Sequence, residues 1–468
     1  MAGSPALKFT VRRQPVVLVA PAGPTPRELK RLSDIDDQDA LRFQLPIIHF
    51  FRRHDGRNGD PAPVLRDAIA AALVHYYPLA GRLRQLEGRK LAVDCTSEGV
   101  LFVEADADIR LDEFGAALQP PFPCLDELLF DVPGSSDLLD TPIIHFQVTR
   151  LACGGFIMAS KIQHTVLDGP GMVQFLSAVA ELARGAVAPT VRPVWARELL
   201  MAMHDDPAPP TIFTHREYDD VPDASGTITP LESMVRRSFF FGPGELSAIR
   251  SHLPPAVRHS ATAFDLLTGC LWRCRTVALA PVAHEEMRMI CLVSPRGRKQ
   301  QSGGTPVVPV GYYGNAFACP VAISTASDLC ANPVSYAVEL VMKTKREVDM
   351  EYMKSVARLM VRRGRPHFTM VHAYVMADVS KFGFRDHDFG WGTPVYGGMA
   401  EGGIGHMTGV TSFLIAVKNS KGEDGLVVPV CLPSPVMDKF VEEMRRLMHP
   451  AVGAVAVPRQ LPVIRSPI

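Results

Sequence analysis

The sequence lacks several features that would assign it to a membrane or to a secretory route. Its 468 residues hold no apolar run near the roughly 18 residues that cross a bilayer. The run VVLVA before Pro21 is too short for a signal peptide. The nine cysteines are scattered, without a C-x-x-C pair or an N-x-S/T sequon, which favours reduced thiols. The end, RSPI, is not a peroxisomal S-K-L signal, so we expect a cytoplasmic rather than a peroxisomal protein.

An excess of charge of either sign is also absent. Lys plus Arg and Asp plus Glu both number 49, so no global field attracts nucleic acid or an anionic membrane, and neither is expected as a partner. With 47% hydrophobic and 21% charged residues, the composition is that of a globular protein. The chain is too long for one ordinary core, which favours more than one folding unit.

Several catalytic signatures are missing too. Without G-x-S-x-G there is no serine nucleophile elbow, and without H-E-x-x-H or paired cysteines there is no metal site. The D-F-G of DFGWG at 388–392 lacks the companion motifs of a protein kinase. The glycine-rich GGIGHMTG lacks a βαβ frame for a dinucleotide. We therefore expect no metal and no bound cofactor.

The apolar periodicity predicts alternating helices and strands in both halves of the chain. The expected helices are 64–76, 172–185, 264–276 (capped by Ser260 or Thr262), 333–348 and one starting near Pro435. The expected strands are 90–93, 154–164, 234–241, 288–294 and 425–433. Residues 186–232 carry seven prolines and little periodicity. The simplest architecture is two α/β domains, 1–185 and 233–468, joined by a crossover linker at 186–232.

The spacing H-x-x-x-D occurs twice, and the surroundings of the two copies differ. His215 to Asp219 (HREYD) lies in the acidic, proline-rich crossover and is expected to be solvated surface. His164 to Asp168 (HTVLD) follows a buried strand and precedes Gly-Pro-Gly, where a side chain can be displayed rigidly. A structural histidine remains an alternative on this argument alone. His164 is the better candidate for chemistry.

Asp168 has three interpretations. It could orient a triad, bind a metal or form an ion pair, and the first two lack the other residues that they need. The turn PRGRK at 295–299 supplies Arg296 and Arg298, either of which could pair with Asp168 through two parallel hydrogen bonds. We prefer this structural role.

Taken together, HTVLDG at 164–169 and DFGWG at 388–392 resemble the plant BAHD acyl-CoA-dependent acyltransferases. The resemblance covers essentially the whole chain. Other stretches that are similar to that family are LSDID at 32–36, YYPLAGRL at 76–83, LTGCLWRCRT at 267–276, SPRGRK at 294–299 and YYGNAFA at 312–318. They are most similar to the alcohol acyltransferase branch that includes benzyl alcohol O-benzoyltransferases.

The resemblance implies two chloramphenicol-acetyltransferase-like α/β domains with mixed sheets and an active-site channel at their interface. It places His164 in the channel as the catalytic residue and turns Asp168 away from the substrate onto an arginine, for which Arg296 is the best candidate. Gly169 belongs to the same supporting motif. A structural role is likewise implied for Asp388, Gly390, Trp391 and Gly392, which help to shape the acyl-CoA side.

The implied reaction moves an acyl group from acyl-CoA, a co-substrate, to a small alcohol in a direct ternary complex, with His164 as general base. Benzoyl transfer to benzyl alcohol is the first expectation, with acetyl as another donor. A second hypothesis uses a hydroxycinnamoyl donor and a phenolic, amine or cell-wall acceptor. The third is a non-catalytic relative that binds a ligand. We expect a monomer.

Overall fold

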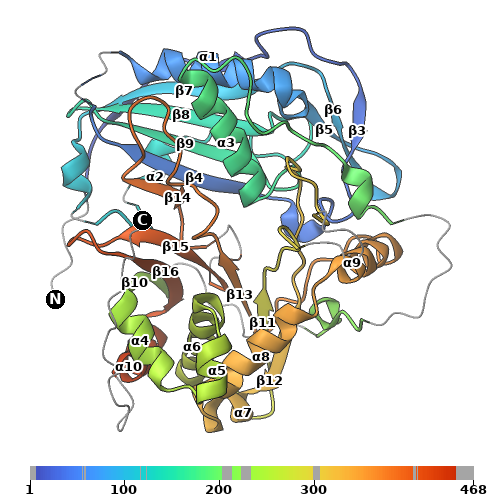
Figure 1. Cartoon of the computed structure of the whole chain (residues 1–468), viewed down its shortest axis with the longest axis vertical. Helices are drawn as coiled ribbons and strands as arrows, with labels where there is room; N and C mark the ends of the chain where they lie inside the picture. The colour runs from blue at the N-terminus through green and yellow to red at the C-terminus, as the bar shows by residue number, and fades with distance from the viewer. Residues whose placement is uncertain are drawn as a thin grey trace, which may run out of the picture.

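The computed structural model describes residues 7–54, 56, 59–115, 117–122, 124–202, 213–222, 233–298, 306–403, 407 and 409–449. In this part of the chain, two large mixed sheets carry helices on their outer faces, and the first and second halves of the sequence lie on opposite sides of the molecule (Figure 1). The residues outside the described part include Lys299 of the basic turn, residues 404–406 and 408 of GGIGHMTG, much of the crossover, and RSPI.

The first sheet holds the strand that leads to His164. Its order is β1-β7-β8-β9-β4-β14, and β2 also pairs with β7. The strands are β1 (Val11–Arg13), β2 (Val17–Val19), β4 (Gln44–Phe51), β7 (Val100–Ala107), β8 (Ile144–Leu151), β9 (Phe156–Gln163) and β14 (Tyr396–Met399). β9 is antiparallel to both of its neighbours, β4 and β8, whereas β7 and β8 are parallel. The near-continuous apolar sequence of β9 fits its burial between two neighbours and two layers.

Two long helices cover this sheet, α1 (Pro61–His75) and α3 (Gly169–Ala183), which lie side by side in Figure 1. Asp60 caps α1 by accepting a hydrogen bond from the backbone of Ala62. α3 begins earlier than the periodicity predicts. Its first turn is the Gly-Pro-Gly segment itself, because a proline in the first turn loses no helical hydrogen bond.

The second sheet has the order β10-β16-β15-β13-β11-β12. Its strands are β10 (Met234–Phe241), β11 (Glu286–Cys291), β12 (Val321–Thr325), β13 (Ala373–Asp378), β15 (Thr411–Lys418) and β16 (Asp424–Pro433). β13 is parallel to β11 and β15, and the other pairs are antiparallel. Both large sheets are therefore mixed, as predicted.

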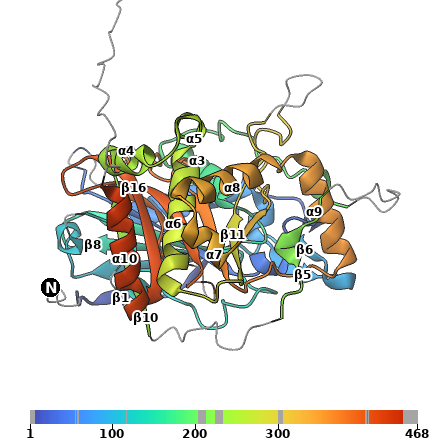
Figure 2. The same ribbon diagram turned by 90° about the horizontal axis from the view of Figure 1, so that it is seen from below.

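Helices of the second half pack below this sheet (Figure 2). They are α4 (Pro243–Ser251), α5 (Pro255–Ser260), α6 (Ala263–Leu279), α7 (Ala326–Ala331), α8 (Val334–Arg346) and α10 (Ser434–Met448). α9 (Met350–Arg362) lies to one side and contacts the short helix at Arg197–Leu200. Of the two candidate caps for α6, the structure has Thr262, whose side chain accepts from the backbone of Asp265 in a capping box. Trp272 and Cys270 of this helix are buried in the core.

A small sheet and several short helices complete the described chain. The sheet has the order β3-β6-β5, from β3 (Leu29–Arg31), β5 (Arg82–Gln85) and β6 (Leu91–Asp94). The short helices are η1 (Asp39–Leu41), η2 (Tyr77–Ala80), η3 (Glu87–Arg89), η4 (Leu111–Phe114), α2 (Leu125–Leu128), η5 (Arg197–Leu200) and η6 (Arg216–Tyr218). Over the described part of 186–232, only η5 and η6 interrupt the irregular backbone. None of the described helices combines the length and apolar character that a membrane crossing requires.

Strand pairing connects the two halves of the chain. β14 comes from the second half of the sequence, yet it pairs with β4 at the edge of the first sheet. Its neighbours in the chain, β13 and β15, belong to the second sheet. The segment between them therefore joins the sheets, and the division at residues 185 and 233 stays a prediction.

Candidate active site

His164 follows β9 directly, where the backbone is held on both sides. Its backbone N–H donates to the carbonyl of Phe43 at 3.0 Å. The imidazole lies 5.1 Å from the Phe43 ring and 5.9 Å from the Phe317 ring, measured between centroids. Only 7% of the residue is exposed. A rigid strand and two aromatic rings thus fix the position of this side chain.

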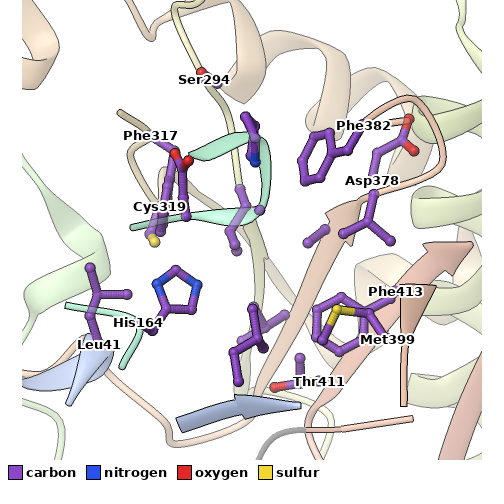
Figure 3. A pocket seen from close by; sticks show the side chains of 18 of the residues that line it. Leu41, His164, Ser294, Phe317, Cys319, Asp378, Phe382, Met399, Thr411 and Phe413 are labelled. Carbon is purple, nitrogen blue, oxygen red and sulfur yellow. The ribbon is translucent and has the colours of Figure 1, made fainter. Parts of the chain in front are cut away.

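The His164 ring faces a cavity of about 220 Å³ between the two large sheets (Figure 3). Leu45 and Met399 reach it from β4 and β14 of the first sheet, whereas Val375 and Phe413 reach it from β13 and β15 of the second. Most of the lining is apolar and much of it aromatic: Ala40, Leu41, Phe43, Leu45, Pro170, Leu292, Phe317, Phe368, Val375, Ala377, Val379, Phe382, Phe384, Met399, Met407 and Phe413. The cavity lies at the junction where the resemblance predicts a channel.

Burial determines the charge state of His164. It lowers the pKa of the imidazole from its ordinary value near 6.5, because the charged form loses its hydration. The His164 carbonyl, Asp168 and Asn315 oppose this effect, and the pKa remains lowered. The neutral imidazole therefore prevails at neutral pH, and it can accept a proton from a ligand in the cavity.

Asp168 is buried and fully engaged by groups other than the imidazole. Its Oδ1 accepts from the backbone N–H of Gly171 at 2.9 Å, which caps α3. Its Oδ2 accepts from the guanidinium of Arg296 and from the backbone of Ala316. The sequence predicted a partner in the basic turn, and the structure places Arg296 there. The cap on α3 is a second task that the spacing did not indicate.

Arg298 and Gly169 are the other two residues of this region that the sequence singled out. The guanidinium of Arg298, the alternative partner, donates to the carbonyl of Val348. A Cβ atom on Gly169 would lie 2.6 Å from the Phe382 ring, which lines the cavity. Only glycine fits at position 169 without moving that ring.

The segment 388–392 forms a tight turn behind β9. The carboxylate of Asp388 accepts from the backbones of Gly390 and Gly392 at 2.7 and 2.9 Å. Both glycines have positive φ, 101° and 79°, where a side chain would be strained. Trp391 packs edge-on against Phe156 of β9, with centroids 5.6 Å apart. No residue of 388–392 is among the described residues that line the cavity, and the supporting role of this motif stays a prediction.

The second H-x-x-x-D was expected to be solvated, and that prediction is wrong. His215 is 7% exposed and Glu217 only 2%. The His215 ring lies 3.0 Å from the Glu217 carboxylate and 2.7 Å from the hydroxyl of Ser355 on α9. Tyr352 of α9 donates to the same carboxylate. Polar composition misled the prediction, because these groups satisfy one another inside the protein.

Two polar residues near His164, Asn315 and Asp36, were not predicted from the sequence patterns. Asn315 donates from its side chain to the His164 carbonyl at 2.8 Å and to Asp36 at 2.9 Å. Asn315 lies in YYGNAFA, where it sits among apolar and aromatic residues, whereas Asp36 lies in the mostly polar stretch LSDID. A lone polar residue such as Asn315 in an apolar setting is a usable signal for a buried hydrogen bond. The partner is hidden from sequence reasoning, since it comes from far along the chain.

In the described part of the chain, no group of three or more His, Cys, Asp or Glu side chains has an arrangement that could hold a metal ion. The described cavity lining also offers no cluster of charged side chains beyond Asp168, Arg296 and Asp378. The site thus holds a buried imidazole with a lowered pKa in an apolar enclosure.

Comparisons with known proteins agree with this arrangement. A family model described as the Transferase family matches residues 7–447. Benzyl alcohol O-benzoyltransferase of Petunia hybrida is 57% identical over 446 residues, covering 95% of both chains. (Z)-3-hexen-1-ol acetyltransferase of Arabidopsis thaliana is 50% identical over 452 residues, covering 96% of this chain and 97% of that one. The crystal structure of vinorine synthase has the same fold, with a TM-score of 0.70 at 20% identity over 94% of this chain and 98% of that chain.

Proposed function

The chain belongs to this Transferase family, that of the BAHD acyltransferases, and we propose that it moves an acyl group from acyl-CoA to a small alcohol, with His164 as the general base. The single observation that carries this proposal is the neutral His164 imidazole facing the cavity between the sheets. Acyl-CoA enters as a co-substrate and leaves as free CoA. The cytoplasmic location and the monomeric state stay predictions from the sequence.

The base addresses the main chemical difficulty of the reaction. An alcohol, with a pKa close to the 15.7 or so of water, does not attack a thioester unaided at neutral pH. His164 takes the hydroxyl proton as the alcohol oxygen bonds to the thioester carbon. As the C–S bond breaks, the same proton passes to the departing CoA sulfur, so the enzyme ends unchanged. Such help is typically worth about 10²–10⁴ in rate, and the enclosure of both substrates supplies more.

The lining of the cavity favours an aromatic or otherwise apolar substrate pair. Phe43, Phe317 and Phe413 line the cavity and can pack against the ring of a benzoyl or benzyl group. This agrees with the printed activity of the Petunia hybrida relative. The Arabidopsis thaliana relative, named for acetyl transfer to an unsaturated aliphatic alcohol, makes acetyl-CoA the second donor to test.

The proposal is tested by thiol release from benzoyl-, acetyl- and hydroxycinnamoyl-CoA, each offered with benzyl alcohol, aliphatic alcohols, phenols and amines. We expect the highest turnover for benzoyl-CoA with benzyl alcohol. The variant His164→Ala should lose at least about 10²-fold in kcat, the lower end for a general base. Its circular dichroism and melting temperature should stay close to those of the parent.

Two outcomes would contradict the proposal. Undiminished turnover in His164→Ala would remove the base from the mechanism. Absence of thiol release with every donor and acceptor would favour a protein that binds a ligand without catalysis.

A further inference from the structure

Asn315 stands at the centre of a buried polar network that reaches His164. Its side chain is fully buried. Its backbone N–H and its side-chain Nδ2 both donate to Oδ1 of Asp36, each at 2.9 Å. The same Nδ2 also donates to the backbone carbonyl of His164 at 2.8 Å. The loop 312–318, the segment 32–37 and the end of β9 therefore meet at one amide group.

These contacts determine which way the amide points. The Nδ2 group has two hydrogens, and the Asp36 carboxylate and the His164 carbonyl accept one each. Turning the amide over would place its oxygen against both of these acceptors, which is unfavourable on both sides. The Asn315 oxygen must then occupy the remaining direction.

Asp36 is itself held firmly, so it is a fixed reference for the amide. Its Oδ2 accepts from the backbone and the hydroxyl of Ser33, at 2.9 and 2.7 Å. The same oxygen lies 3.0 Å from the guanidinium of Arg197, and both side chains of this ion pair are fully buried. With these donors on Oδ2, the carboxylate is held in place as an acceptor for Asn315.

Two polar atoms remain unpaired beside this network. The Asn315 Oδ1 and the His164 Nδ1 are both buried, and neither meets hydrogen-bond geometry with another group in the described chain. A buried polar atom without a partner is costly. The Asn315 side chain acts on the pKa of the His164 imidazole, so the unpaired acceptor and the unpaired potential donor belong to neighbouring groups. Hydrogen bonds of catalytic groups are commonly long before substrate binds and tighten in the complex.

We propose that Asn315 is a positioning residue for His164: its Oδ1 accepts the proton on Nδ1, which leaves the lone pair of Nε2 facing the cavity. This inference rests on the function proposed above and names a side-chain group that, together with the histidine's own backbone carbonyl, keeps the base in its reactive tautomer. The Asp168 carboxylate does not take this role, because both of its oxygens are engaged elsewhere.

An amide oxygen suits this task for a chemical reason. It accepts a hydrogen bond from Nδ1 but is too weakly basic to remove the proton, so the imidazole keeps one tautomer throughout. Asn315 also opposes the lowering of the His164 pKa by burial. Its removal should therefore lower that pKa further.

The first experiment reads the tautomer in the unaltered protein without substrate. The protein is labelled with ¹⁵N-histidine, and the His164 signals are identified by their loss in His164→Ala. We expect a protonated Nδ1 and an unprotonated Nε2 at pH 7.5. A proton on Nε2 would overturn the proposal, whether or not the protein catalyses acyl transfer, so the two proposals fail separately.

The second experiment uses Asn315→Ala, with Asn315→Ser as a smaller disturbance that can still donate to Asp36. We expect kcat to fall about 10- to 100-fold, the size that misplacement of a catalytic group produces, with the KM for acyl-CoA nearly unchanged. The acid limb of the pH–rate profile should move to lower pH. An unchanged kcat and profile in either folded variant would overturn the proposal.

Gln147 provides the matched control for loss of a buried amide. Its side chain is 2% exposed and hydrogen-bonds to Glu127, Thr149 and Phe130 within the first half of the chain. Gln147→Ala should lower stability while its pH–rate profile stays that of the parent. A shifted acid limb in this control as well would show that the Asn315 effect is merely structural.

Discussion

At the scale of single residues, a four-residue spacing separates two different tasks. His164 and Asp168 are neighbours in one motif, yet the imidazole faces the cavity and the carboxylate faces Arg296 and the first turn of α3. Burial affects the two in opposite ways. It keeps the imidazole neutral and reactive, whereas the carboxylate is compensated by an ion pair and two backbone donors.

Asp168→Asn separates the ion pair from the helix cap. Asparagine still caps a helix through its amide oxygen, so the change removes the charge opposite Arg296 and turns an amide NH2 toward the donors of Arg296 and Ala316. We expect the free energy of unfolding to fall by about 1–3 kcal/mol, less than for a fully buried pair because Arg296 is partly exposed. Urea denaturation measures this loss.

Asp349 offers the matching substitution. It caps α9 through the backbone of Tyr352 and, within the described residues, forms no ion pair. Asp349→Asn should therefore lower the free energy of unfolding by clearly less than Asp168→Asn does. A fully stable Asp168→Asn that has lost its turnover would contradict the structural role of Asp168.

At the scale of elements, the crossover is held down more firmly than its composition suggests. η6 contributes His215 and Glu217 to a buried cluster with Ser355 and Tyr352 of α9. Arg363 also donates to the carbonyl of Tyr218 at 2.7 Å. The cluster fastens an irregular segment to a regular helix, which is a role in stability and not in catalysis.

Ser355→Ala tests this role. The change leaves a buried nitrogen of His215 without its partner, which costs about 1–3 kcal/mol. We expect a lower free energy of unfolding with kcat and KM unchanged. Lys354→Ala, on the exposed side of the same helix, is the control and should have little effect. Lost turnover at unchanged stability in Ser355→Ala would point to a second active site instead.

At the scale of the whole molecule, a strand and a pair of histidines are among the contacts that join the two halves. β14 adds to β4 of the first sheet. Nearby, Nδ1 of His387 lies 3.3 Å from Nε2 of His49 on β4, and Nε2 of His387 lies 3.1 Å from the carbonyl of Val173 on α3. Both rings are buried. Burial disfavours a charge on either imidazole, and two charged rings would also repel each other.

This pair predicts a loss of stability in mild acid. Burial lowers the pKa of His387 to about 4, and burial and His387 lower that of His49 well below its ordinary value. Between about pH 6.5 and 4 the unfolded chain binds protons that the folded protein excludes, so stability falls as the pH falls through this window. For His387 alone the loss is on the order of 3 kcal/mol.

His387→Gln should flatten that dependence. The free energy of unfolding is measured by urea denaturation at several pH values between 7.5 and 4. His387→Gln is compared with the parent and with the control His284→Gln, which alters an exposed histidine. The parent and the His284 variant should lose stability alike, whereas His387→Gln should lose less. Equal slopes in all three proteins would contradict a buried neutral pair.

The local sequence determined much of the fold, because periodicity and capping act between near neighbours. The strand before His164 and the helices around 64–76 and 264–276 were predicted to within a few residues. The pair of motifs also indicated the family, which the comparisons bear out. The onset of α3 was missed because Gly-Pro-Gly is typical of a turn as well as of a first helical turn.

Only the tertiary structure decided which polar groups meet. Asn315 reaches Asp36 and His164 across intervals of 279 and 151 residues, and no local pattern encodes such a pairing. The same holds for β14 in the first sheet and for the burial of His215. A buried polar group takes whichever partner the folded chain brings to it. The sequence by itself therefore nominated His164 as the candidate base, and the fold selected the groups that surround it.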